Sequence, residues 1–367
     1  MTVIAVARRR PVNEACMALQ ICRVPGAAAW EACRAARPGA TIFHRWDWLA
    51  TLAPALDKHF LPLGFYRGDA LVGLAPLLIK RLGPYKNANW APFPYRGPLV
   101  PAALWPHALR ALDDYQRRNG IGLMQFGLAP DADVDPILEG TAHRRSDMQF
   151  GLAPDADVDR TALRAAGYAL HADTTMVLPL AGRGEEDLRA GMTSHGRKNL
   201  KRAERGGVEV RAATESDITR ELPALTEEVF APQQQAPPYP PAAARVFWDR
   251  YHDDPEVRMA TAYCAGEPAA ISITIGDGRH AYFWQGAAWR RFRNLNPNAA
   301  VYWDGILWAR ARGYAELDMV GTPDPGIAYY KSTFGAIETP YLVAGRVNSR
   351  PMAWARHAHD RARRWRP

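Results

Sequence analysis

Alternating apolar and polar positions predict two β-hairpins, one in each half of the chain. Residues 65–80 alternate around a turn at Gly68-Asp69, and residues 262–275 alternate around a turn at Gly266-Glu267. Short glycine-containing turns between alternating apolar runs are typical of antiparallel hairpins. The pattern therefore predicts the same supersecondary unit in both halves.

Each predicted hairpin is followed by a strand, a helix and another strand. These are expected at residues 89–100, 102–118 and 122–128 in the first half, and at 280–287, 298–312 and 314–321 in the second. Both helices end at a glycine, Gly120 or Gly313, as is common just beyond a helix C-terminus. We predict two α/β domains of the same fold, with mixed sheets. Each should have its own central sheet, with a cleft between the domains and a boundary near residues 181–186.

An exact repeat occupies residues 124–135 and 148–159, where MQFGLAPDADVD occurs twice with a period of 24 residues. A solenoid needs several, usually divergent, units, so this is a different feature. Removing residues 136–159 leaves a plausible strand, loop and helix. We interpret the segment as a recent tandem duplication or an artefact of the sequence record, with one copy in the core strand and the other peripheral.

Residues 194–205 read as a basic helix stopped by Gly206-Gly207 and followed by a strand. Arg197, Lys201 and Arg205 recur every four residues on one face of this helix, with no carboxylate on that face. Such a stripe is either a solvated helix face or an anion site, and the sequence leaves both open.

Two other segments stand out by composition. Residues 231–244 are rich in proline and glutamine and are expected to form a loop, with a flap over a cleft as one role. Residues 345–367 hold seven arginines and one aspartate, most of the net charge of +8. A helical tail there would either bind phosphates or be a solvated helix pinned by Trp354 and Trp365.

One lysine lies among aromatic residues between Gly326 and Gly335. We expect a loop here, and two interpretations of Lys331 are open. Partial burial would make it an anchor for an anionic group or an oxyanion. Alternatively, its stem packs on Tyr330 or Phe334 while the ammonium stays hydrated.

Composition narrows the class of protein. With 367 residues, 48% of them hydrophobic and 23% charged, the chain has the composition of a soluble globular protein of two domains. Its four cysteines lack metal-ligand spacing, no secretory signal precedes them, and no apolar run approaches the ~20 residues of a membrane span, so a reduced, cytoplasmic protein is expected. No hydrolase, P-loop, zinc-protease or dinucleotide-binding motif occurs.

Three motifs together resemble a known family: RKNLK at residues 197–201, YFWQG at 282–286, and LDMVG at 317–321 followed by YKSTFG at 330–335. Their order and spacing resemble the Fem-type (FemABX) aminoacyl-tRNA-dependent transferases and their relatives with a BioF2-like acetyltransferase domain, which contain two tandem GNAT-like domains. The likeness covers about residues 40–347. We divide the chain into an N-terminal tail (1–20), two GNAT-like domains (21–183 and 184–347) and an Arg-rich tail (348–367).

The resemblance implies an N-acyltransferase that moves an aminoacyl group from aminoacyl-tRNA to an amine of a peptidoglycan-precursor-like or small natural-product acceptor, forming an amide. No cofactor beyond the donor is implied. Lys331 matches the family lysine linked to the donor ester or the tetrahedral intermediate. Arg197, with Lys198 and Lys201, matches residues associated with acceptor phosphates. The chain departs from the family at Pro101, where an Asp commonly follows Arg-Gly-Pro and two apolar residues.

Aminolysis of an ester depends on alignment, worth ~7–11 kcal/mol in favourable cases, and on oxyanion stabilisation, worth ~3–4 kcal/mol per donor. We expect Lys331 to be that donor. Asp318 and Asp324 are candidate bases, each with a structural alternative as a strand-end or turn acceptor. Solvent or the substrate's ester oxygen are further proton acceptors. The other expected substrate-binding residues are Arg96, Tyr282, Trp284, Gln285 and Tyr330, of which Tyr282 and Trp284 either floor an acyl pocket or pack in the core.

Two alternatives remain. An acyl-CoA-dependent GNAT would hold the pyrophosphate in a glycine-rich loop before a helix, but residues 288–298 contain no glycine. An inactive GNAT-like module that binds a polysaccharide or an assembly partner is favoured by Pro101. The sequence is compatible with peripheral membrane contact and leaves the oligomeric state open.

Overall fold

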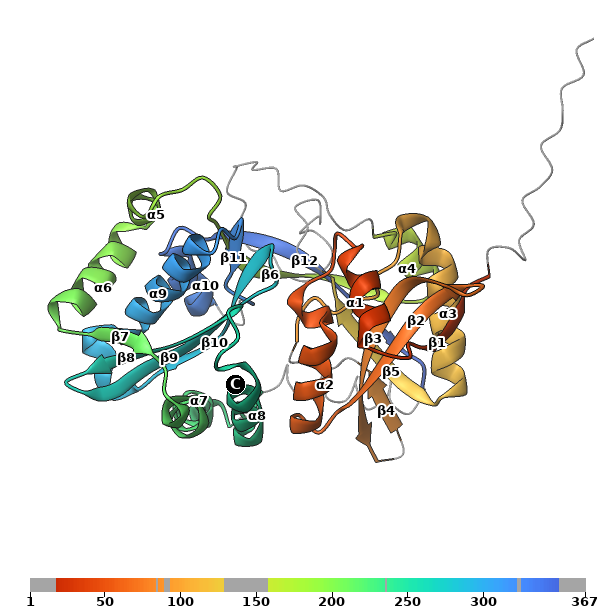
Figure 1. Cartoon of the computed structure of the whole chain (residues 1–367), viewed down its shortest axis with the longest axis horizontal. Helices are drawn as coiled ribbons and strands as arrows, with labels where there is room; N and C mark the ends of the chain where they lie inside the picture. The colour runs from red at the N-terminus through yellow and green to blue at the C-terminus, as the bar shows by residue number, and fades with distance from the viewer. Residues whose placement is uncertain are drawn as a thin grey trace, which may run out of the picture.

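The computed structural model describes residues 18–83, 85–88, 93–128, 158–234, 236–321 and 325–349, which form two halves joined by long strands (Figure 1). The first half contains β1 (Gln20–Arg23), α1 (Ala27–Ala35), α2 (Trp46–Ala55), β2 (His59–Arg67), β3 (Ala70–Leu82), β4 (Tyr85–Ala88), α3 (Trp105–Arg118), β5 (Ile121–Gly127), α4 (Arg160–Ala165) and β6 (Ala169–Pro179).

Helices α5 (Glu185–Gly191) and α6 (Ser194–Arg205) lead into the second half. It contains β7 (Glu209–Ala212), α7 (Leu222–Phe230), α8 (Pro241–Tyr251), β8 (Val257–Cys264), β9 (Glu267–Gly276), β10 (His280–Ala288), α9 (Pro297–Ala311), β11 (Glu316–Asp318), α10 (Pro325–Ser332) and β12 (Ile337–Val347). The order β-α-α-β-β-β-α-β-α-β is identical in the two halves. The predicted duplication of one structural unit is therefore confirmed.

All the strands belong to one mixed sheet, in the order β1-β2-β3-β4-β5-β12-β6-β11-β10-β9-β8-β7. The expectation that each half has a separate sheet is therefore wrong. The last strand of each half pairs with the other half: β12 pairs with β5, and β6 pairs with β11. β6 and β12 also pair with each other along nine residue positions, centred on Asp173 and Tyr341. This reciprocal exchange joins two similar units into one sheet.

Aromatic side chains from both halves form a shared core at the junction. The rings of Trp48 on α2 and Trp284 on β10 have centroids 5.0 Å apart. Those of Phe43 and Tyr282 are 5.2 Å apart. Edge-to-face aromatic pairs add to the gain from burial. The two halves are therefore held together by packed rings as well as by exchanged strands.

Three local expectations need correction. The strand expected at 89–100 is β4, at 85–88, and the described part, 93–100, is irregular apart from one bridge between Leu74 and Leu99. Pro94 and Pro98 explain this, because proline cannot donate to a strand ladder. The segment 231–244 is a loop only in part, since α8 begins at Pro241.

The third correction concerns the segment around Lys331. Residues 325–332 form α10 and not a loop. The proline at its first position suits a helix start, because the missing N–H would have no partner there. Lys331 is therefore held on a regular element.

The first copy of the exact repeat supplies the core strand, because Met124 lies on β5 and is fully buried. Residues 129–157, and with them most of the second copy, lie outside the described residues, as does the Arg-rich tail from residue 350 on. The second copy ends at Asp159, whose carboxylate accepts a hydrogen bond from Ala162 N at 2.8 Å and caps α4.

Deleting residues 136–159 is expected to leave a folded protein, because Asp135 then directly precedes Arg160 and replaces Asp159 as the cap. Removing either copy gives the same sequence, so the result does not depend on which copy forms the strand. Gel filtration and a circular-dichroism melt would measure it. A deletion of equal length at 140–163 should unfold, since it removes the buried Leu163. Aggregation of the 136–159 variant would contradict the duplication hypothesis.

Candidate functional site

The centre of the second half contains two parallel strands that diverge. β10 and β11 pair only over His280–Tyr282 and Glu316–Asp318. On its other side β10 pairs with β9 from Ala281 to Ala288, with a bulge between Phe283 and Gln285. Bulges of this kind bend a strand and often lie next to active sites. The side chains that follow the last paired residues therefore line the point of divergence.

Asp318, the last residue of β11, is only 2% exposed. Its Oδ1 accepts hydrogen bonds from Thr175 Oγ1 at 2.5 Å and from Val320 N at 2.7 Å. Burial raises the pKa of the Asp318 carboxyl, and these hydrogen bonds and the charge of Lys331 oppose the rise. Within the described residues, Oδ2 has no hydrogen-bond partner. A buried carboxylate with raised pKa and an unpaired oxygen is suited to accept a proton.

Lys331 lies near the same carboxylate and is 4% exposed. Its ammonium donates hydrogen bonds to the carbonyl oxygens of Val320, at 3.0 Å, and Gly321, at 2.5 Å. The interpretation with a hydrated ammonium is therefore wrong. The positive charge is held inside the protein by the turn that follows β11.

This turn has an unusual backbone. Val320 has φ +50°, and Gly321 has φ +73°. The left-handed region costs a non-glycine residue about 1–2 kcal/mol, and a β-branched residue there is a true outlier. Asp318 accepts the Val320 N–H, Lys331 binds both carbonyls, and Thr175 Oγ1 accepts the Gly321 N–H at 3.0 Å. Strain retained by several contacts is typical of functional sites.

Tyr95 adds a group from the first half that the sequence did not indicate. It is fully buried and has φ +49°. Its hydroxyl has no hydrogen bond of normal geometry with a described residue, yet it faces Asp318 and Thr175 closely enough to influence their titration. Burial and the nearby Asp318 raise the pKa of Tyr95 well above its usual value. The exchanged strands bring these residues together, which no local pattern reveals.

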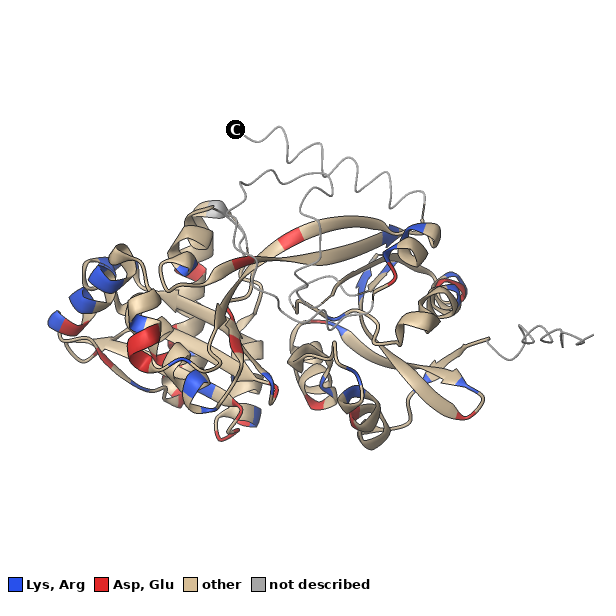
Figure 2. Cartoon of the chain, turned by 90° about the horizontal axis from the view of Figure 1, so that it is seen from above, with Lys and Arg blue, Asp and Glu red and all other residues tan. Residues whose placement is uncertain are grey.

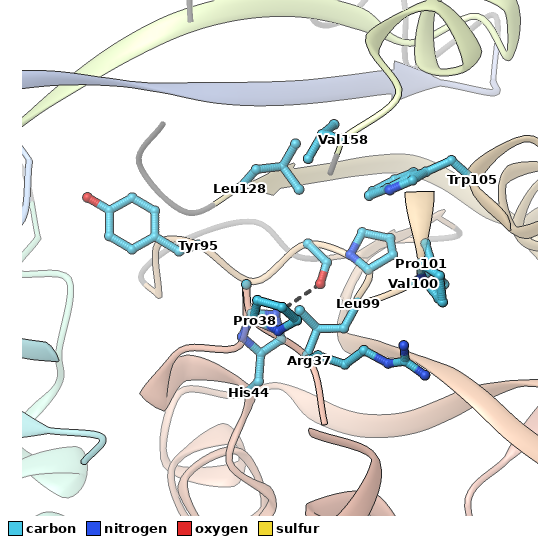
Figure 3. A pocket seen from close by; sticks show the side chains of 13 residues that line it. Arg37, Pro38, His44, Tyr95, Leu99, Val100, Pro101, Trp105, Leu128 and Val158 are labelled. Atoms are coloured by element: carbon cyan, nitrogen blue, oxygen red, sulfur yellow. Dashed lines mark hydrogen bonds between the residues drawn. The ribbon is translucent and has the colours of Figure 1, made fainter. Parts of the chain in front are cut away.

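The backbone around Tyr95 also borders a small hollow in the first half, of about 90 Å³ (Figure 3). The Tyr95 ring points away from it, whereas Trp105 and Leu128 line it. His44 Nε2 donates to Gly97 O at 3.0 Å, and burial lowers the pKa of His44 to about 3. This histidine is neutral and structural. The hollow is small enough to hold only a small group.

Tyr282 and Trp284 lie in the core at the junction of the two halves. Tyr282 is 3% exposed, and its hydroxyl donates to Asp277 Oδ2 at 3.0 Å. Trp284 is 8% exposed and occupies the bulge of β10. Gln285 follows the bulge and is half-buried. Core packing accounts for the positions of both rings.

The remaining predicted residues do not gather in one place. Tyr330 packs on Tyr302 and Phe334, with ring centroids 5.4 and 5.5 Å apart. Asp324 lies outside the described residues. Arg96 is 1% exposed and lies at the junction. Asp318 and Lys331 are thus the two predicted residues that the structure brings together.

The predicted basic helix is α6, capped by Thr193, and its cations follow the outer edge of the second half (Figure 2). A Cβ on Gly196 would lie 2.2 Å from Thr333 O, so glycine lets α6 approach the end of α10. Arg197 donates to the carbonyl oxygens of Ala190, at 3.1 Å, and Met192, which fixes the end of α5. Lys198 and Lys201 are exposed.

Among the described residues, no group of three His, Cys, Asp or Glu side chains is arranged to hold a metal ion. In the same part of the chain, no helix has the length and hydropathy needed to cross a membrane.

Comparison with known proteins supports the architecture. Residues 193–332 match the family model described as an acetyltransferase (GNAT) domain. The crystal structure of FemX is similar with a TM-score of 0.66 and 13% identity, covering 92% of this chain and 99% of that one. No functionally curated protein matches the sequence.

Two further solved structures have the same fold. L-PGS from Bacillus licheniformis has a TM-score of 0.52 and 13% identity, covering 90% of this chain and 95% of that one. A tandem GNAT protein from the clavulanic acid biosynthesis pathway has a TM-score of 0.51 and 13% identity, covering 90% of this chain and 99% of that one. Residues 193–332 thus match a GNAT acetyltransferase domain, in a chain whose fold resembles those of FemX and of a tandem GNAT protein.

Proposed function

We propose that this protein is an N-acyltransferase that transfers an aminoacyl group from aminoacyl-tRNA to an amine of a peptidoglycan-precursor-like or small natural-product acceptor. The observation that carries the proposal is the buried pair of Asp318 and Lys331 where β10 and β11 diverge. The GNAT domain supports acyl transfer, and the FemX-like fold supports the choice of donor. Use of charged tRNA implies a cytoplasmic site of action.

The chemistry follows from the two charges. The acceptor amine attacks the ester carbonyl, and Asp318 accepts the proton that the nitrogen loses. The buried charge of Lys331 stabilises the negative charge that develops on the carbonyl oxygen. When the intermediate collapses, the leaving oxygen takes the proton back from Asp318. The products are an amide and the free hydroxyl of the donor, so protons balance without another reactant.

The segment before α9 favours a donor other than acyl-CoA. Residues 290–295 form a short 3₁₀ helix, and α9 begins at Pro297. Proline lacks an N–H, and no glycine opens the loop for close approach of a pyrophosphate. An acyl-CoA-dependent enzyme remains the second candidate, because the matching family model is described as an acetyltransferase domain. The buried carboxylate with its unpaired oxygen argues against an inactive binding module.

We further propose that the exposed lysines of the basic helix, which the resemblance associates with acceptor phosphates, also contact the phosphates of the charged tRNA, and this provides a test of the donor. If Lys198 and Lys201 contact phosphates, binding of aminoacyl-tRNA should weaken with salt, and Lys198→Gln with Lys201→Gln should reduce the slope of log K against log salt by about one per contact. Filter binding would measure this, with acetyl-CoA as competitor. Arg81→Gln, an exposed cation of β3, is the control. An unchanged slope, or displacement of tRNA by acetyl-CoA, would contradict the proposal.

A further inference from the structure

Arg96 is a buried cation that has no carboxylate partner among the described residues. It is 1% exposed, and its Nε and Nη1 have no hydrogen-bond partner in the described part of the chain. Burial lowers the pKa of Arg96 to about 9, and no carboxylate offsets this. Lys58 is another nearby cation, and its pKa is lowered to about 8 by burial and then by Arg96. Buried charges in proteins are normally paired, so this one needs an explanation.

The surroundings of Arg96 offer further donors and few acceptors. The guanidinium carbon lies 5.7 Å from the centroid of the Phe93 ring. Around the same ring lie Trp48, at 6.1 Å, and Trp284, at 6.5 Å. The indole N–H of Trp48 is buried and forms no hydrogen bond of normal geometry with a described residue. That of Trp284 faces the buried hydroxyl of Tyr239, which also lies near Arg96. Arginine and tryptophan donate hydrogen bonds and cannot accept them.

We propose that Arg96 binds the carboxylate of a substrate at the junction of the two halves, within the aromatic cluster of Phe93, Trp48 and Trp284. A carboxylate carries one negative charge and two acceptor oxygens, which match one guanidinium and neighbouring N–H donors. A phosphate dianion would need the charge of Lys58 in addition to that of Arg96, so inorganic phosphate is a competing anion in the test. A chloride ion also accepts hydrogen bonds from several donors, so each carboxylate is compared with sodium chloride of equal ionic strength.

The position of Arg96 indicates which reactant carries the carboxylate, and this step rests on the proposed acyl transfer. Arg96 directly follows Tyr95, whose hydroxyl faces Asp318. Because neighbouring Cα atoms are about 3.8 Å apart, the segment that reaches the proposed base also carries Arg96. The acceptor would then be a molecule with both an amine and a carboxylate, of amino-acid or peptide type.

The test uses the full chain and needs no variant at first. Acetate, up to roughly 100 mM because so small a ligand binds weakly, should raise the melting temperature saturably above that in sodium chloride of equal ionic strength. Acetamide, its neutral analogue, should have no effect. Glycine then stands for a free amino acid and N-acetylglycine for a peptide C-terminus. The one whose effect on the melting temperature saturates at the lower concentration indicates the source of the carboxylate. Inorganic phosphate serves as the competing anion.

Arg96→Gln should abolish the response to acetate and, without ligand, should melt no lower than the wild type, because it removes an unpaired buried charge. Arg250→Met is the matched control: this arginine stacks 5.3 Å from the Tyr251 ring of the same core, yet its side chain is 53% exposed. It should keep the response.

Stabilisation by phosphate or chloride alone, or an equal response in Arg96→Gln, would overturn the inference. If carboxylates bind but no acyl transfer occurs, the proposed function fails while the site stands. If acyl transfer occurs but carboxylates do not bind, the proposed function stands and the carboxylate site fails.

Discussion

Lys331→Met is expected to lower turnover by ~100-fold or more, the scale seen for loss of one oxyanion donor. Methionine keeps much of the volume of the lysine side chain but removes its positive charge. Lys331 is 4% exposed, and its charge lies near Asp318. Lys331→Arg should restore only part of the activity, because a planar guanidinium does not replace a compact ammonium. Steady-state rates with the native donor and acceptor would measure this. Wild-type turnover by the methionine variant would contradict a catalytic role.

A second variant separates charge from support of the turn. Lys331 binds the carbonyl of Val320, whose φ of +50° is unfavourable for a β-branched residue. Val320→Gly removes the strain, so the turn should no longer need the lysine. If Lys331 acts only by holding the turn, the double variant with Lys331→Met recovers activity. If its charge acts on the reaction, the double variant stays as slow as Lys331→Met.

Asp318→Asn is expected to reduce turnover by ~10²–10⁴-fold while leaving the fold intact. The amide oxygen can still accept from Thr175 and Val320, and the amide nitrogen takes the place of the unpaired Oδ2. Because burial raises the pKa of Asp318, the acid limb of the wild-type rate profile should lie above the usual aspartate range. The variant should lack that limb. Retention of the limb would exclude Asp318 as the base.

The Asp318→Asn variant should lose activity without losing stability. A pKa that is higher in the folded than in the unfolded protein means that the folded state binds more protons between the two values, so stability falls as pH rises through that window. Asparagine avoids this penalty. The variant should therefore melt no lower than the wild type at pH 7, and its relative stability should grow as pH rises above about 4. A large loss of stability would indicate that Asp318 is mainly structural.

The local elements could be predicted from the sequence where strand alternation or helical spacing was clear. The hairpins, α3, α9 and the basic helix lie where alternation, helical spacing and stop glycines placed them. The prediction failed at residues 93–100, where prolines interrupt the ladder, and around Lys331, where a helix starts with proline. In both cases the prolines are present in the sequence, but their effect on the backbone depends on the strands that lie beside them.

The candidate site was only partly predictable. Asp318 and Lys331 stand in a motif that resembles a known family, and their burial beside one turn supports that choice. Tyr95 could not have been found, because its proximity to Asp318 arises from the exchange of β6 and β12 between the halves. Arg197 is a further case: its spacing left an anion site and a solvated helix face open, and in the structure its side chain binds carbonyl oxygens at the end of α5, a contact that the spacing did not indicate. Local patterns report which residue types are present, whereas contacts between distant segments decide what they do.

The measurement that tests the central claim most directly is a single-turnover assay with radiolabelled aminoacyl-tRNA or acetyl-CoA and an amine acceptor that carries a carboxylate. Wild-type protein should deacylate the tRNA with formation of an acceptor amide, and Asp318→Asn of equal melting temperature should not. Consumption of acetyl-CoA alone would contradict the donor assignment. Equal amide formation by the Asp318→Asn variant, or none by the wild type with any donor, would contradict the proposed active site.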